Sequence, residues 1–224
     1  LVFSDPGPEL REVPREAGEV RRILESAGLS VSSLSPREGW RLDLVRLLSS
    51  SQLLHYCGHG TFLPPEGSAG GRPYGRLRLS SGGTVDYREI TLAGRSPRLL
   101  AFLNSCESGM LRFDPGSIDP FGLVPNLLAA GFSAVLAPAL PVGDEVAGRA
   151  ASAFYRSLAS GSTVGEAFLG ARREVYSAIS SGELKTPLRR NLCAEDRELL
   201  ALLDSWNLLL YGRTEGVLGD QESR

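Results

Sequence analysis

The sequence is poor in several residues on which common functions depend. Its 224 residues include two histidines, three cysteines, one methionine (Met110) and one lysine (Lys185). A small, odd number of cysteines is atypical of a secreted domain stapled by disulfides, so the sequence predicts free thiols in a reducing, cytoplasmic setting. Because Met110 is the only methionine and the chain starts at Leu1, we expect a domain cut from a longer multidomain protein.

An excess of charge of either sign is also missing. The 24 basic and 26 acidic residues leave a formal charge of -2, so we expect neither nucleic acid nor an anionic membrane as a partner. Residues 120–143 carry no charge, but proline and glycine interrupt them, which favours a buried helix, turn and strand over a membrane span. The 42% of hydrophobic residues can fill a core, and we predict one domain over residues 1–214 with a polar tail over 215–224.

Hydrophobic periodicity predicts an α/β fold. Strands are expected at 1–4, 31–34, 52–57, 98–104, 133–140 and 208–211, and a hairpin outside the main sheet around 77–87. Helices are expected at 14–27, from the capping-box residues 35–38 to about 49, and at 121–130, 145–159, 164–179 and 199–205. Thr163 and Glu166 have the spacing of a capping box for the helix at 164–179. This alternation predicts a largely parallel sheet with helices on both faces and a ligand site beyond the carboxyl ends of its strands.

Two candidate catalytic residues follow predicted strand ends. His59 lies in Cys-Gly-His-Gly (57–60), where the strand at 52–57 gives way to a glycine-flanked loop, and Cys106 lies in Asn-Ser-Cys-Glu-Ser-Gly (104–109). A thiol with an ordinary pKa of about 8.5 is mostly protonated at neutral pH, so a cysteine nucleophile needs a neighbouring base. His59 is placed to be that base. The backbone N–H groups of Gly60 and Cys106 are candidates for an oxyanion hole.

These motifs resemble the CHAT branch of the caspase-like cysteine peptidases, which are relatives of separase. The similarity extends over nearly the whole chain, through Leu-Leu-Ala-Ala-Gly (127–131), the segment 137–145 and the closing segment 206–212. The resemblance implies a three-layer caspase-like sandwich of about six strands. His59 is then the catalytic base and Cys106 the nucleophile of peptide-bond hydrolysis, with no cofactor and no metal.

The resemblance also implies limited, regulated cleavage of a protein substrate in bacterial signalling or defence, under a regulatory domain or activator that is not in this chain. The Gln-Ala-Cys-x-Gly signature of true caspases is absent, so specificity for aspartate does not transfer. Glu107, Asp144 and Glu145 are possible substrate-binding residues. For Glu107, a role in polarising the site and a role in capping the following turn are equally supported. For Asp144 and Glu145, capping of the helix that begins there is favoured over substrate binding.

Other readings remain open at this stage. His55, Cys57 and His59 alternate along an extended segment and could together bind zinc, although His55 fits better as a core residue. Cys57 and Cys193 are expected to be inert. The chain could also be a catalytically silent interaction or signalling module. A nucleotide-binding regulator is disfavoured, because no Gly-rich phosphate loop occurs.

Overall fold

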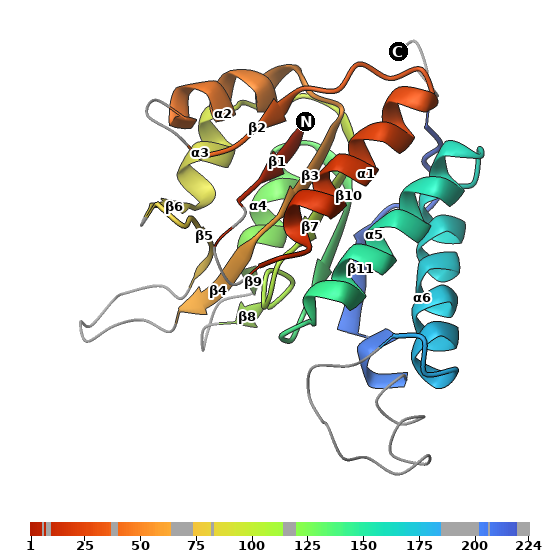
Figure 1. Ribbon diagram of the computed structural model, residues 1–224. Helices are drawn as coiled ribbons and strands as arrows, with labels where there is room; N and C mark the ends of the chain where they lie inside the picture. Colours follow the sequence, from red (N-terminus) through yellow and green to blue (C-terminus); the bar gives the residue numbers. More distant parts are fainter. Residues whose placement is uncertain are drawn as a thin grey trace.

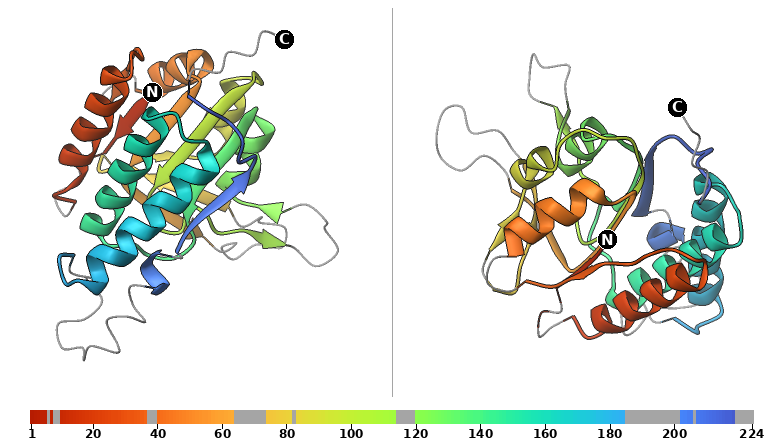
Figure 2. Two further views of the ribbon diagram at one scale, coloured as in Figure 1. Left: turned by 90° about the vertical axis from the view of Figure 1, so that its right-hand side faces the viewer. Right: turned by 90° about the horizontal axis from the view of Figure 1, so that it is seen from above.

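The computed structural model of the chain describes residues 1–5, 7, 10–36, 40–63, 74–81, 83–113, 120–184, 202–205 and 207–218. At its centre lies a six-stranded sheet with helices on both faces (Figures 1 and 2). In spatial order its strands are β11 (Leu208–Gly212), β10 (Phe132–Pro138), β7 (Arg98–Asn104), β3 (Leu53–Cys57), β1 (Val2–Ser4) and β2 (Ser33–Leu34). All neighbours pair in parallel except β11, which is antiparallel to β10. The predicted α/β, mostly parallel sheet is confirmed.

The two faces of the sheet carry separate hydrophobic cores. Along β7, Ala101 and Leu103 face one core, while Leu100 and Phe102 face the other. The first core packs against α2 (Trp40–Ser50), α3 (Tyr87–Leu92) and α4 (Leu123–Ala129). The second packs against α1 (Val13–Ser26), α5 (Asp144–Ala159) and α6 (Val164–Ser180), so the molecule has three layers (Figure 2). Burial on both faces explains why β3, β7 and β10 are almost continuously apolar.

A smaller antiparallel sheet joins β4 (His59–Leu63), β5 (Tyr74–Arg78) and β6 (Thr84–Val85). The predicted hairpin is therefore present as β5 and β6. The loop predicted at 58–60 is wrong in part, because His59 and Gly60 begin β4 and pair with Arg78 and Leu77 of β5. Strands β8 (Arg112–Phe113) and β9 (Pro120–Phe121) form a second small sheet near the same end of the main sheet (Figure 1).

Most predicted helices are confirmed. Helix α6 begins with the expected capping box, in which the Thr163 hydroxyl accepts from the Glu166 N–H and the Glu166 carboxylate accepts from the Thr163 N–H. Within residues 120–143 the predicted helix and strand are present as α4 and β10, but Phe121, the predicted start of the helix, belongs to β9 instead. Of the predicted helix at 199–205, residues 202–205 are helical, while 199–201 and Cys193 lie outside the described residues. Within the described part of the chain, no helix has the length and apolar character needed to cross a membrane.

Candidate active site

Neighbouring strands of the main sheet deliver the two candidate catalytic residues. Strands β3 and β7 are parallel partners, and their register places Cys57 beside Asn104 at their last residues. His59 and Cys106 each follow two residues later, at the carboxyl edge of the sheet. Both residues are half-buried, and His59 Nε2 itself is buried.

Several contacts join the segment that carries His59 to the segment that carries Cys106. The Gly58 N–H donates to the Asn104 carbonyl over 3.4 Å, and the Phe62 N–H donates to Glu107 Oε2 over 3.0 Å. Gly60 lies directly against the Cys106 turn: a Cβ at this position would come within 2.9 Å of Ser105 Oγ and closer still to the Cys106 carbonyl oxygen. The close packing explains why glycine is needed at position 60.

The backbone carbonyl of His59 accepts a hydrogen bond from the buried side chain of Tyr56. Tyr56 Oη donates to the His59 carbonyl over 3.0 Å and lies 3.3 Å from the Arg78 carbonyl. Burial raises the pKa of Tyr56 well above its usual value, and Asp5 and Cys57 add to the effect, so the phenol keeps its proton as a donor. Gly58 allows this arrangement, because a Cβ there would lie 2.6 Å from Tyr56 Oη. The phenol thus fixes the start of β4.

The turn after β7 is held from two sides. Ser108 is buried, and its hydroxyl donates to the carbonyls of Ser105 and Leu103 over 2.8 and 3.2 Å. The Gly109 N–H donates to the Pro138 carbonyl over 2.8 Å, and Tyr211 Oη donates to the Gly109 carbonyl over 2.7 Å. Glu107 has a left-handed φ of 57°. The Cys106 thiol lies 4.0 Å from the Val142 carbonyl and comes from a backbone fixed at both ends.

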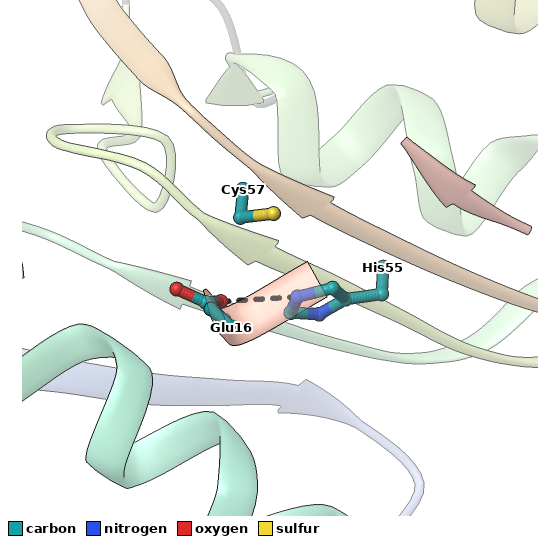
Figure 3. A group of neighbouring side chains, drawn as sticks. All are labelled: Glu16, His55 and Cys57. Atoms are coloured by element: carbon teal, nitrogen blue, oxygen red, sulfur yellow. Dashed lines mark ion pairs between the residues drawn. The ribbon is translucent and has the colours of Figure 1, made fainter. Parts of the chain in front are cut away.

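Figure 3 shows a buried cluster of polar side chains from α1 and β3. Ligand atoms of Glu16, His55 and Cys57 lie within 4.8 Å of one another, and all three residues are buried. These three could hold a metal ion. His59 is not part of this group, in contrast to the zinc alternative considered from the sequence. His55 is fully buried, in agreement with the predicted core role.

The two described cysteines differ sharply. Burial raises the pKa of the Cys57 thiol well above its usual value, and the carboxylates of Glu16, Asp144 and Asp5 raise it further. Cys57 is fully buried, whereas Cys106 is half-buried. Burial disfavours the thiolate of Cys57, so Cys106 is the better candidate nucleophile of the two cysteines that the structure describes.

The three carboxylates considered for substrate binding have different surroundings. Glu107 accepts the Phe62 N–H, and Asp144 Oδ2 accepts the Glu12 N–H at the start of α1 over 2.8 Å. Asp144 therefore caps another helix rather than its own. Glu145 is exposed in the first turn of α5. It lines a pocket of about 350 Å³ together with Arg149. Their role in substrate binding stays a prediction.

Sequence reasoning did not assign a site role to Tyr56 or Asn104. Asn104 was visible as the residue that ends the strand before Cys106, but its side-chain partner, Glu16, is 88 residues away. The partners of Tyr56 are backbone carbonyls, for which sequence gives no signal. Only the folded chain brings these groups together.

Comparison with known proteins gives the family. The model of the CHAT domain family matches residues 1–190. No curated protein matches the chain at a significant level of sequence similarity.

Solved structures share the fold at low sequence identity. Two crystal structures of the Saccharomyces cerevisiae separase–securin complex match with TM-scores of 0.57 and 0.55 and identities of 16% and 18%, and each covers 94% of this chain. The chain spans only 12% and 11% of those proteins. The Arg-specific cysteine proteinase gingipain R matches with a TM-score of 0.62 and 14% identity over 97% of this chain and 47% of its own. The predicted caspase-like architecture is confirmed.

Proposed function

Since the chain belongs to the CHAT domain family, we propose that it is a cysteine endopeptidase that uses His59 as base and Cys106 as nucleophile. One observation carries the proposal: the paired ends of β3 and β7 deliver an imidazole and a thiol to the same edge of the sheet. The hydrogen bond from Phe62 to Glu107 and the packing of Gly60 on the Cys106 turn support it, because they hold the two segments together.

The reaction needs no group beyond these residues. The Cys106 thiol gives its proton to the His59 imidazole, and the thiolate attacks the scissile carbonyl carbon. The N–H groups of Gly60 and Cys106 are proposed to bind the oxyanion of the tetrahedral intermediate. As the intermediate collapses, the C–N bond breaks and the leaving amine takes the proton from the imidazolium. Water, deprotonated by His59, then cleaves the thioester, and the thiol is regenerated.

We propose limited cleavage of one protein substrate in the cytoplasm, as part of bacterial signalling or defence. The separase structures similar to this chain were solved as complexes with securin. By analogy, a regulatory domain or activator protein is proposed to order the site of this chain and raise its activity.

Alkylation tests the proposal before any substrate is known. Cys106 is labelled with iodoacetamide from pH 5 to 9 and followed by mass spectrometry, beside His59→Ala and Cys106→Ser variants. We expect labelling of Cys106 below pH 8 in the wild type and only above about pH 8 in His59→Ala. Labelling that is indifferent to His59 would reject the dyad and favour a catalytically silent interaction module.

A further inference from the structure

A connected series of buried polar side chains extends from α5 to the ends of the strands that precede the proposed dyad. Glu16 Oε1 accepts from Asn104 Nδ2 over 2.7 Å, and it lies 3.0 Å from His55 Nε2 (Figure 3). His55 Nδ1 lies 3.3 Å from Tyr155 Oη. Glu16, His55 and Tyr155 are each at most 3% exposed. Side chains of β3 and β7 thus meet at one carboxylate of α1, and α5 joins the group through the contact of Tyr155 with His55.

Tyr155 of α5 lies at one end of this series of polar groups. Burial raises the pKa of Tyr155 well above its usual value, and Glu16 and Cys57 raise it further, so the phenol keeps its proton; the tautomer of His55 decides which of the two groups donates. His55 Nε2 is the ring nitrogen nearest Glu16, although the two groups are not aligned closely enough for a strict hydrogen bond. Asn104 Nδ2 donates to Glu16 Oε1, and His55 Nε2 lies within ion-pair distance of the same oxygen.

The position of this carboxylate relates it to the proposed site. Asn104 is the last residue of β7 and precedes Cys106 by two positions, while His55 lies in β3 and precedes His59 by four. The sheet register also pairs Asn104 with Cys57. Glu16 therefore contacts side chains of both strands just before those strands deliver the two reacting groups.

A metal ion is the competing account of the same atoms. Glu16, His55 and Cys57 have the right ligand types and lie close together. However, Glu16 Oε1 already accepts the Asn104 amide N–H and lies 3.0 Å from His55 Nε2. Protein contacts account for the carboxylate without an ion, which favours a positioning role.

We propose that Glu16 is a positioning residue, whose carboxylate fixes the ends of β3 and β7 relative to each other and so sets the approach of His59 to Cys106. The inference rests on the proposed function, because it concerns the geometry of the same dyad. A buried carboxylate that links two strands stabilises one relative placement of them, since any shift would leave a buried polar group without its partner.

The test replaces Glu16 by methionine, which has similar length but no acceptor, and measures the rate of Cys106 alkylation by iodoacetamide from pH 5 to 9. We expect Glu16→Met to slow labelling at pH 7 about tenfold, because a larger fraction of the thiol stays protonated when the imidazole is displaced. Glu16→Gln keeps one oxygen acceptor and is expected to stay within about threefold of the wild type. Circular dichroism and thermal melting show whether each variant is folded.

The matched control is Glu19→Gln on the same helix, since Glu19 contacts only Arg156 among its described charged partners, in an ion pair at the surface. We expect it to label as the wild type does. If Glu16→Met fails to fold, Asn104→Leu removes the same link from the side of β7 and is expected to give the same slowing.

The outcomes separate the two proposals. A His59-dependent pH profile that Glu16→Met and Asn104→Leu leave unchanged would overturn the positioning role alone. A profile that His59→Ala does not change would reject the dyad, and the positioning role with it. Binding of one equivalent of Zn²⁺ to the wild type, lost in Cys57→Ser, would make the cluster a metal centre and overturn the inference.

Discussion

At the scale of single residues, Gly60 is the most sensitive contact between the two halves of the site. A methyl group in Gly60→Ala would meet Ser105 Oγ and the Cys106 carbonyl, and the latter belongs to a turn that is held at both ends. We expect a loss of about 1–3 kcal/mol in the free energy of unfolding, because the turn must shift to make room. Urea unfolding measures the loss, and slower alkylation of Cys106 at pH 7 reports the displacement.

Gly18→Ala is the matched control, because Gly18 is exposed within α1 and a Cβ there would meet nothing within 4 Å. We expect this substitution to raise the free energy of unfolding by about 0.5–1 kcal/mol, since alanine favours the helix. A Gly60→Ala protein as stable as the wild type would show that the turn is not constrained as described.

At the scale of elements, one arginine joins three helices at the edge of the sheet opposite the site. The Arg98 guanidinium donates to the carbonyls of Leu48, Ala93 and Ala130, which lie at or near the carboxyl ends of α2, α3 and α4. Arg98 is only 2% exposed. A planar group with five N–H donors can serve several carbonyls at once, and its charge complements the helix ends.

Arg98→Met is therefore expected to lower the free energy of unfolding by about 3 kcal/mol, because three or more buried carbonyls lose their donor. Urea unfolding at pH 7 measures the change. Arg21→Met removes an exposed i,i+4 pair with Glu25 and should change stability by no more than about 0.5 kcal/mol. A similar small effect at both positions would contradict the role given to Arg98.

The elements also show what the sequence could and could not predict. Long periodic segments such as α5 and α6 were predictable, because one apolar face repeats over several turns. Helix α3 was missed, although Asp86 and Glu89 form a capping box at the start of its six residues. Strand β4 was predicted as a loop, because its glycine gives no strand signal and its pairing partner, β5, supplies the order.

The candidate site divides in the same way. The placement of His59 and Cys106 after strand ends follows from local patterns and the rule for parallel sheets. The cluster of Glu16, His55 and Asn104 could not be predicted in this way, because its contacts join α1 to two strands that are distant in sequence. Long-range packing, which has no local pattern, determines these contacts.

At the scale of the whole molecule, two tyrosine hydroxyls and one cysteine thiol are buried on the two faces of the main sheet. Tyr56 belongs to the core beneath α2, α3 and α4, while Cys57 and Tyr155 lie on the α1 and α5 side. Burial is the largest cause of the raised pKa in each case. Folding therefore prefers the protonated form of all three.

The sign of the pH dependence follows from these shifts. The unfolded chain ionises near the ordinary pKa values of about 8.5 for cysteine and 10 for tyrosine, while the folded chain holds its protons. The stabilisation is complete below those values and is lost as the pH rises above them. We expect the free energy of unfolding to fall from about pH 9, and most steeply above pH 10, where each buried tyrosine contributes a slope of up to about 1.4 kcal/mol per pH unit.

Tyr155→Phe tests this expectation directly. The variant loses the hydrogen bond to His55 and is expected to be less stable at pH 7 by about 1 kcal/mol, but its stability should fall less steeply between pH 10 and 11 because one titrating group is gone. Urea unfolding at several pH values measures both slopes. Equal slopes for wild type and Tyr155→Phe would mean that Tyr155 ionises in the folded chain as readily as in the unfolded one.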